Sequence, residues 1–228
     1  MSIDKKATRQ QLLDWIEEDQ DALVDFFSGF VAQASPNPPG DTRNATQYLA
    51  NWMTAKGIDP QIVAPQEEMP NILAVTDGAG PGRHLVMNGH IDVFPVDENE
   101  KWTRGAWSGE LADGAVWGRG ASDMKCGTSA SIIAFEYLSR IKDHWSGKLV
   151  LTAVSDEETG GKWGTRYLLD HHADECVGDC VLNAEPSGLN SVRFAEKGTL
   201  RVTFRVETPG AHGAYPPAAP MPIVSLLI

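Results

Sequence analysis

Four short motifs in the sequence are rich in histidine and carboxylate residues: GHIDVFP at 89–95, GRGASDMKCG at 118–127, SDEETGG at 155–161 and NAEPSG at 183–188. Each motif taken alone is ordinary, because a single His-x-Asp is usually a surface pair or a satisfied core histidine. One histidine together with several carboxylates is a set of donors that suits Zn²⁺, with Mn²⁺ or Co²⁺ as substitutes. The four motifs, in this order, therefore predict a metal site.

His90 and Asp92 are two residues apart, so on an extended backbone their side chains point to one face. A metal-bound imidazole usually donates its second ring N–H to a carboxylate, which fixes the orientation of the ring. We therefore expect His90 to bind a metal and Asp92 to orient it.

Three further carboxylates have the properties of a two-metal site. Glu157 and Glu158 are adjacent, so their side chains diverge, and one can bind a metal while the other faces a water that the metal activates. Asp123 lies in a glycine-flanked turn, where its two carboxylate oxygens could bridge two metals. Sites of this type hold their ions about 3.5–4 Å apart and activate a water between them.

Three of the four motifs follow directly on predicted strands. HLVMN at 84–88 precedes the histidine motif, KLVLTAV at 148–154 precedes the two adjacent glutamates, and CVLNA at 180–184 precedes Glu185. Strands that alternate with helices predict an α/β fold with a mostly parallel sheet flanked by helices. Such sheets bind ligands at the carboxyl ends of their strands, and Asp123, just before a predicted helix, can reach the same edge.

Helical periodicity marks most of the remaining elements. Apolar residues recur at spacings of three, four and seven from Lys6 to about Gln33, which predicts one helix that ends before the prolines of SPNPPG at 35–40. Asp41 is the expected N-cap of a second helix, which ends at Gly57. Two more helices are expected at 126–142 and 162–172, two short strands at 61–64 and 71–76, and a functional loop at 94–120.

The sequence pattern changes near Ser191, where two β-rich runs, SVRFAE and GTLRVTFRVET, follow one another. This change predicts a metal-binding catalytic domain at 1–196 and the start of a second, α+β domain at 197–228.

The composition excludes several classes of protein. With 19 basic and 31 acidic residues the formal net charge is −12, which disfavours nucleic acid as a partner. No apolar stretch is long enough to span a bilayer, and the charged N-terminus lacks the apolar core of a secretory signal. Three cysteines without a C-x-x-C pair indicate reduced thiols. We expect a soluble cytoplasmic protein with no membrane or nucleic-acid partner.

At the four motifs, and also at SPNPPGDT, the chain resembles the M20-type metallopeptidases, a family that includes acetylornithine deacetylase, succinyl-diaminopimelate desuccinylase, aminoacylase and carboxypeptidase G2. The resemblance runs from about Ser35 to Pro216. It implies a zinc-exopeptidase-like catalytic domain followed by a dimerisation or lid domain, and a homodimer. It also implies two divalent metals, Zn²⁺ first and Co²⁺ or Mn²⁺ as alternatives. A metal-activated water would hydrolyse the amide bond of a small-molecule substrate, an N-acyl amino acid or a peptide.

The resemblance implies a role for each matching residue. His90 and Glu185 would bind the first metal, Glu158 would bind the second, and Asp123 would bridge the two. Glu157 would be the general base, which takes a proton from the bridging water and passes it to the leaving amine.

Two features outside these motifs are implied in the same way. GAHGAYP at 210–216 resembles the histidine motif of the second domain, so that His212 would reach the active site of the other subunit and stabilise the oxyanion of the tetrahedral intermediate. The peptide bond between Asp123 and Met124 would be cis.

The sequence departs from the family pattern in one respect. Family members are longer and take a histidine for the second metal from a C-terminal segment, and after His212 the sequence contains no further histidine. Because the chain stops at Ile228, the resemblance implies a catalytic domain that lacks its C-terminal segment and a second domain that is truncated. Two alternatives to a metallo-amidohydrolase therefore stay open. One is a non-catalytic fragment that binds at most one metal, and the other is a related two-metal aminopeptidase. The acyl group and the amino acid of the substrate also stay open.

Overall fold

The structure, a computed structural model, describes residues 5–205 except Glu98, Leu189, Glu196, Thr199 and Arg201. The chain divides into two units, Met1–Pro186 and Ser187–Ile228. The described residues of the second unit lie in no helix or strand, so the β-runs expected from Ser191 onward are not seen in them.

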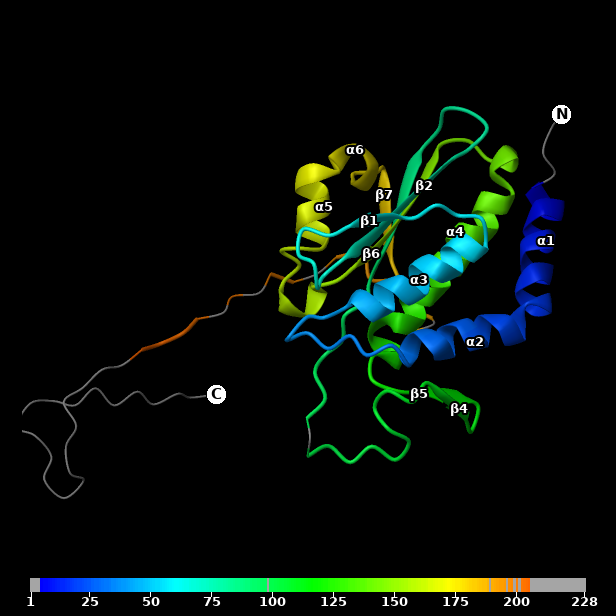
Figure 1. The fold of residues 1–228 in the computed structure, drawn as a ribbon. Coiled ribbons are helices and arrows are strands. Elements are labelled where there is room, and N and C mark those ends of the chain that lie inside the picture. Colours follow the sequence, from blue (N-terminus) through cyan, green and yellow to red (C-terminus); the bar gives the residue numbers. More distant parts are fainter. Residues whose placement is uncertain are drawn as a thin grey trace, which may run out of the picture. The chain divides into compact units, whose positions relative to one another are not determined.

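A five-stranded sheet, in the order β1-β2-β6-β3-β7, forms the centre of the first unit (Figure 1). Its strands are β1 Gln61–Val63, β2 Asn71–Asp77, β3 His84–His90, β6 Lys148–Val154 and β7 Cys180–Asn183. β3 pairs in parallel with both β6 and β7, whereas β2 pairs antiparallel with β6 and with β1. Thus β2 runs against the other four strands of this sheet, which confirms an α/β fold whose sheet is mostly parallel.

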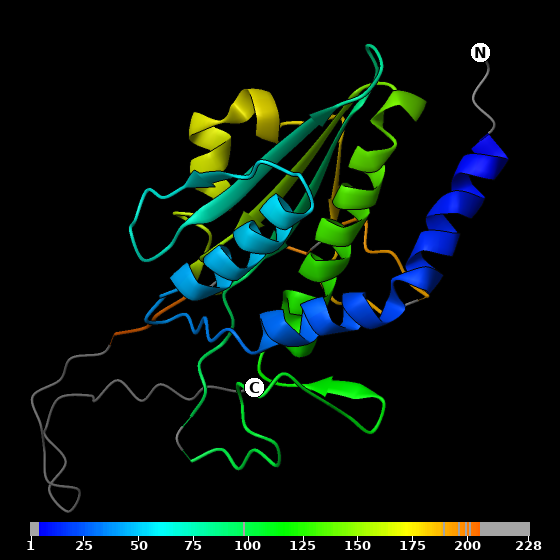
Figure 2. The ribbon, with the colours of Figure 1, turned by 45° about the vertical axis from the view of Figure 1, so that its right-hand side comes forward.

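Helices cover both faces of this sheet, as Figure 2 shows from the side. The helices α2 Gln20–Val31, α3 Arg43–Ala55 and α4 Cys126–Arg140 lie on one face, and α5 Thr165–His171 and α6 Ala173–Cys176 lie on the other. Alternation along β6 explains the two layers, because successive side chains of a strand point to opposite faces. Leu149 and Leu151 pack against the first group of helices, and Val150 packs against the second.

The N-terminal helix is broken, contrary to the single helix expected from Lys6 to Gln33. α1 spans Lys5–Glu18 and has no buried residue, and α2 starts after Asp19. At the break the Tyr137 hydroxyl of α4 donates to the carboxylate of Asp19 at 2.8 Å and lies 3.2 Å from the carbonyl oxygen of Trp15. The apolar spacing continues through Asp19, so the sequence alone does not mark this change of direction.

The start of α3 also differs from the expectation. Thr42 occupies the N-cap position, whereas Asp41 was expected there. The carboxylate of Asp41 instead pairs with the guanidinium of Arg43 at 2.6 Å. Thr42 turns its hydroxyl toward the sheet and donates to Ser155 Oγ at 2.9 Å, so this turn is attached to the end of β6.

The long segment before α4 contains a small hairpin of its own. β4 Glu110–Ala112 and β5 Ala115–Trp117 pair antiparallel, and Arg104 pairs with Glu110 at 2.6 Å and Asp113 at 2.8 Å. Three short irregular turns complete the described elements of this unit: Ala121–Lys125 before α4, Lys142–His144 before β6 and Glu157–Thr159 after β6.

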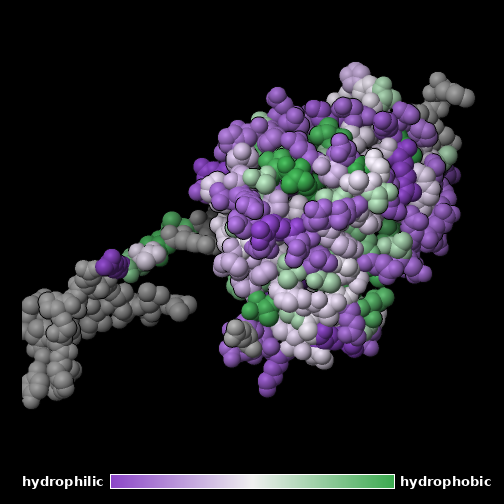
Figure 3. Space-filling view, in the orientation of Figure 1, coloured by the Kyte–Doolittle hydropathy of each residue, from purple (hydrophilic) through white to green (hydrophobic). Residues whose placement is uncertain are grey.

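The face of the molecule seen in Figure 3 is mainly hydrophilic, with apolar side chains in small separate groups. None of the helices described is both long and apolar enough to cross a membrane.

Candidate metal centre at the carboxyl edge of the sheet

The parallel strands bring the predicted metal residues to one edge of the sheet. His90 is the last residue of β3 and lies opposite Val154, the last residue of β6. The turn Glu157–Thr159 follows β6, and Glu185 comes two residues after the end of β7. The sequence-based placement of these motifs at strand ends is therefore confirmed, with His90 within β3 rather than beyond it.

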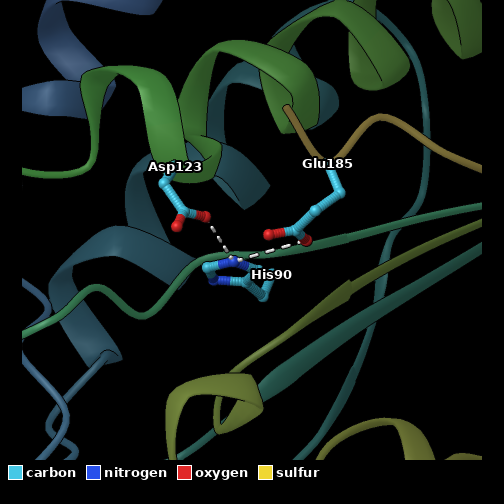
Figure 4. Close-up of side chains that lie close together, drawn as sticks. All are labelled: His90, Asp123 and Glu185. Carbon is cyan, nitrogen blue, oxygen red and sulfur yellow. Dashed lines mark hydrogen bonds and ion pairs between the residues drawn. The ribbon is translucent and has the colours of Figure 1, made fainter. Parts of the chain in front are cut away.

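His90, Asp123 and Glu185 form a compact group, in which one ligand atom from each lies within 4.8 Å of the others. Figure 4 shows the carboxylates of Asp123 and Glu185 pointing toward the same nitrogen of the imidazole. His90 Nε2 is 3.3 Å from Asp123 Oδ1 and 3.7 Å from Glu185 Oε2. The imidazole is almost fully buried, whereas the side chain of Asp123 is 59% exposed, so the group opens to solvent on its carboxylate side.

Hydrogen bonding fixes which nitrogen of His90 faces the carboxylates. Nδ1 lies 2.8 Å from the main-chain carbonyl oxygen of Asp92, which can only accept a hydrogen bond, so Nδ1 carries a proton. The Asp92 carboxylate is next to it, with Oδ1 at 3.4 Å. A neutral His90 thus presents the lone pair of Nε2 to the carboxylate oxygens of Asp123 and Glu185, which repel it. Either a proton on Nε2 or a metal cation between the three side chains would relieve this repulsion.

The titration of His90 reflects this crowding. Burial opposes the charged imidazolium, but the carboxylates of Asp92 and Glu185 outweigh burial and raise the pKa of His90 to about 9. For Glu185, burial and the neighbouring carboxylates of Asp123 and Glu157 raise the pKa to about 7, against the opposing effect of His90. Burial likewise raises the pKa of Glu158. Carboxylates with raised pKa values around one imidazole are a set of donors whose excess negative charge a divalent cation would offset.

Asp92 connects the two strands that carry the site. Its carboxylate is fully buried, and it accepts hydrogen bonds from the main-chain N–H groups of Glu157 at 3.2 Å and Glu158 at 3.1 Å. Asp92 therefore holds the turn after β6 as well as standing beside His90. The sequence predicted its proximity to the imidazole but not its bonds to the two glutamates.

The side chains of the adjacent residues Glu157 and Glu158 point to different places. Glu157 places Oε2 3.9 Å from His90 Nε2, and its side chain is 55% exposed. Glu158 is half-buried, and its carboxylate lies outside the compact group of His90, Asp123 and Glu185. The structure thus brings Glu157 to the open side of the group, while a metal-binding role of Glu158 stays a prediction.

Two fully buried residues, Met124 and Lys125, follow Asp123 in the chain. The peptide bond between Asp123 and Met124 is cis, as the resemblance implied. Met124 is fully buried, and its sulfur accepts the main-chain N–H of His90 at 3.3 Å. Lys125 is also fully buried, and its ammonium donates to the carbonyl oxygens of Phe30 at 3.1 Å and Gln33 at 2.5 Å, at the end of α2. Burial lowers the pKa of Lys125 to about 7.

Glu185 is positioned by its own segment and by α4. Its main-chain N–H donates to Asn183 Oδ1 at 2.7 Å, and the amide of Asn183 donates to Asn88 Oδ1 of β3 at 3.1 Å. On the other side, a Cβ added to Gly127 would collide with the carbonyl oxygen of Ala184. The first turn of α4 therefore lies directly against the residue that precedes Glu185.

Two residues near the site, Asn37 and Thr159, were not predicted from the sequence, and one residue that was predicted, His212, lies outside the residues that the structure describes. Asn37 donates to the carboxylate of Asp92 and to the hydroxyl of Thr159, and the only signal for Asn37 was its place among the prolines of 35–40. His212, predicted to act on the oxyanion, lies outside the residues that the structure describes.

Comparison with known sequences identifies relatives of this chain. The sequence model of the peptidase family M20/M25/M40 matches residues 86–227. A succinyl-diaminopimelate desuccinylase of Cereibacter sphaeroides is 35% identical over 197 residues, which cover 84% of this chain and 51% of that protein. The chain thus spans about half the length of the curated relatives it matches.

Solved structures share the fold at low sequence identity. An M20 family metallo-carboxypeptidase from Sulfolobus solfataricus, Sso-CP2, superposes with a TM-score of 0.63 at 22% identity, over 75% of this chain and 38% of that one. The YXEP protein of Bacillus subtilis, described as a dinuclear metal-binding peptidase of the M20 family, gives a TM-score of 0.54 at 17% identity, over 73% of this chain and 43% of that one.

Proposed function

Because the chain belongs to the peptidase family M20/M25/M40, a family of hydrolases, we propose that the protein is a metal-dependent hydrolase of an amide bond in an N-acyl amino acid or a short peptide. The observation that supports this most directly is the convergence of His90, Asp123 and Glu185, whose ligand atoms lie within 4.8 Å of one another. The exposed carboxylate of Glu157 stands beside this group, where a substrate and a water can approach from solvent.

The metal ligands in this proposal are His90, Asp123, Glu158 and Glu185, which would hold two divalent ions. One nitrogen donor with carboxylate oxygens suits Zn²⁺ first, with Co²⁺ or Mn²⁺ as alternatives. A bound cation would supply an acidified water and would offset negative charge that develops on the amide oxygen.

The protein's own groups supply proton transfer and orientation. Glu157 accepts the proton of the attacking water and returns it to the leaving nitrogen, and its position depends on the bond from its main-chain N–H to Asp92 Oδ1 at 3.2 Å. Asp92 also keeps the proton of His90 on Nδ1, through the carbonyl contact at 2.8 Å, so that Nε2 stays available as a ligand.

The proposal extends to parts of the chain beyond the described site. Residues 1–196 would form the catalytic domain, and residues 197–228 would begin a domain through which two subunits pair. His212 would then act in the active site of the other subunit of a homodimer. We also retain the expectation of a cytoplasmic protein that binds neither nucleic acid nor a membrane.

One observation favours a second candidate function. The compact group contains one histidine and two carboxylates, and Glu158 lies outside it. A chain that binds a single metal and does not hydrolyse amides fits this arrangement, and the number of bound metal ions separates it from the first proposal.

The substrate test uses amides that differ in the acyl group. The metal-loaded chain is incubated with N-succinyl, N-acetyl and N-formyl amino acids and with dipeptides, and the release of free amine is measured. N-succinyl compounds come first, because a relative with 35% identity is a succinyl-diaminopimelate desuccinylase. Glu157→Gln is the matched control, since it keeps the shape of the side chain and removes its basic oxygen.

The outcomes are distinct. Turnover of any of these amides that requires metal and falls about 10²–10⁴-fold in Glu157→Gln supports the proposal. Turnover that Glu157→Gln retains would show that another group accepts the proton. Tight binding of one metal ion with no turnover of any amide would favour the second candidate, and a preference for peptides with a free N-terminus would favour an aminopeptidase.

A further inference from the structure

The turn at residues 35–40 lies beside the segment that follows His90. Pro36 and Val93 form an isolated parallel bridge. The main-chain N–H of Asn37 donates to the carbonyl oxygen of Val93 at 2.9 Å, and that of Val93 donates to Ser35 at 3.0 Å. The Ser35 hydroxyl donates to the carbonyl oxygen of Ile91 at 2.7 Å. Through these bonds the turn places the side chain of Asn37 over Asp92.

The amide of Asn37 makes two hydrogen bonds that join the segments following two different strands. Its Nδ2 donates to Asp92 Oδ2 at 2.9 Å and to Thr159 Oγ1 at 2.9 Å. Asp92 follows β3, and Thr159 ends the turn that follows β6. Asn37 is only 2% exposed and Asp92 is fully buried, so the bond between them is formed away from bulk water, whereas Thr159 is exposed.

The Asp92 carboxylate is fully buried and accepts three hydrogen bonds from Asn37 and the turn after β6. Oδ2 accepts from Asn37 and from the N–H of Glu158 at 3.1 Å, and Oδ1 accepts from the N–H of Glu157 at 3.2 Å. A buried carboxylate needs several such donors, because burial without them strongly disfavours its charge. Of these three donors Asn37 alone is a side chain, because the other two are main-chain N–H groups.

We infer that Asn37 is a positioning residue, whose amide fixes Asp92 and the Glu157–Thr159 turn relative to each other and thereby sets the distance between His90 and Glu157 across the site. The inference rests on the proposed function in its consequence for metal binding and catalysis. The positioning itself concerns hydrogen bonds that exist without a metal.

The chemistry of the amide explains why asparagine is suited to this place. Both partners of Nδ2 are acceptors in this arrangement, so the residue must offer two N–H donors from one atom. Aspartate has nearly the same shape, but it would offer no donor and would place a second carboxylate against Asp92. Asn37→Asp is therefore the most informative single change, and Asn37→Ala shows the effect of removing the side chain alone.

Ser35→Ala is the matched control. Ser35 lies in the same turn, is fully buried, and loses one hydrogen bond to the Ile91 carbonyl on substitution, whereas its hydroxyl forms no described hydrogen bond with Asp92. A residue that merely stabilises the turn would behave like Ser35. Thr159→Val removes the second acceptor of Asn37, on the turn after β6, and it serves if the substitutions at Asn37 prevent folding.

The first measurement is the pair of main-chain amide resonances of Glu157 and Glu158 in the metal-stripped chain, by two-dimensional nitrogen–proton NMR. We expect both resonances to move in Asn37→Asp and Thr159→Val, because their acceptor Asp92 is displaced, and to stay in place in Ser35→Ala. Unchanged resonances in Asn37→Asp and Thr159→Val, or equal shifts in Ser35→Ala, would overturn the inference.

The second measurement is the affinity for Co²⁺, read from its visible absorption. Substitution of a residue that orients metal ligands typically weakens metal binding about 10–100-fold, and we expect a loss of that size in Asn37→Asp with a changed Co²⁺ spectrum. Ser35→Ala should bind Co²⁺ as the unsubstituted chain does. If the unsubstituted chain itself bound no Co²⁺, the proposed function would fail, while the amide resonances would still decide the role of Asn37.

Discussion

Gly127 lies against the carbonyl oxygen of Ala184, so closely that no side chain fits between α4 and the segment that carries Glu185. Asp123 precedes α4 in the chain and Glu185 follows Ala184. The close approach of these two backbones is thus one reason why two carboxylates distant in sequence face the same imidazole.

We predict that Gly127→Ala weakens metal binding and destabilises the fold. The added methyl must displace the Ala184 backbone and with it Glu185, and forced insertion into a packed site typically costs about 1–3 kcal/mol. Chemical denaturation and a metal titration measure the two effects. Gly80→Ala is the control, because its nearest neighbour, Ser146 Oγ, lies 3.9 Å from the added Cβ. Equal metal affinity in Gly127→Ala and the unsubstituted chain would contradict the prediction.

The roles of Glu158 and Glu185 can be separated by counting bound ions. Glu158→Gln should keep one equivalent of Zn²⁺ or Co²⁺ and lose the second, because Glu158 lies outside the compact group of three. Glu185→Gln should weaken the first equivalent, because Glu185 Oε2 is 3.7 Å from His90 Nε2. Metal analysis after dialysis gives the count, with Asp174→Asn, an exposed carboxylate of α6, as the control. Two retained equivalents in Glu158→Gln would remove Glu158 from the ligand set.

Metal binding should release protons, and the release should decrease as the pH rises. In the metal-free chain the pKa of His90 is raised to about 9 and that of Glu185 to about 7, so both groups hold protons at pH 6 that a metal must displace. The apparent affinity should therefore rise with pH, most steeply below pH 7. Calorimetric titrations in buffers of different ionisation enthalpy measure the release. A pH-independent affinity between pH 6 and 8 would contradict it.

The same two pKa values predict how the stability of the metal-free chain depends on pH. Both pKa values are higher in the folded chain than the ordinary values of 6.5 for His90 and 4.5 for Glu185. The folded chain therefore binds more protons than the unfolded one between these limits. The stability that these groups contribute is complete at low pH and is lost as the pH rises through about 7 for Glu185 and about 9 for His90. Urea denaturation of the metal-stripped chain at pH 6, 7 and 8 checks this direction, with Glu185→Gln as the comparison.

Replacement of Lys125, which is fully buried, should lower the free energy of unfolding more than replacement of an exposed lysine does. Lys125→Met leaves the carbonyl oxygens of Phe30 and Gln33 without their donor, which typically costs about 1–3 kcal/mol. Lys142→Met, at an exposed position, should change the free energy of unfolding by less than about 0.5 kcal/mol. Denaturant titration compares the two. A loss no larger in Lys125→Met than in Lys142→Met would show that these two bonds contribute little.

The sequence could predict the strands and the residues at their ends, because both depend on local patterns. The apolar run of β6 is buried on both faces of the sheet, as expected of a strand in a parallel sheet covered by helices. Once β3, β6 and β7 are placed in parallel, their carboxyl ends meet, and His90, Glu157 and Glu185 must come together. The approach of these three residues could therefore be predicted from the placement of their motifs after strands, whereas the role of each residue was implied by the family resemblance and stays a prediction.

The features that the sequence did not predict depend on contacts between distant segments. Asn37 acts on Asp92 only because the turn at 35–40 packs beside residues 91–93, and no local spacing reports that packing. The break at Asp19 depends on Tyr137 in α4, and the N-cap position of Thr42 on Ser155 after β6. In each case a side chain from another element decides the local conformation.

The position of β7 at the end of the sheet has a consequence for the dynamics of the site. Among the strands that the structure describes, β7 pairs only with β3, and its side chains Val181 and Leu182 are 57% and 52% exposed, so little apolar burial opposes its detachment. Its detachment would carry Glu185 away from His90 while the core of the sheet stays folded. Amide hydrogens of β7 should therefore exchange with solvent deuterium faster than those of β6 in the metal-free chain. A bound cation would close this local opening and slow exchange in β7 selectively, so that the affinity of the site includes the free energy needed to keep the last strand in place.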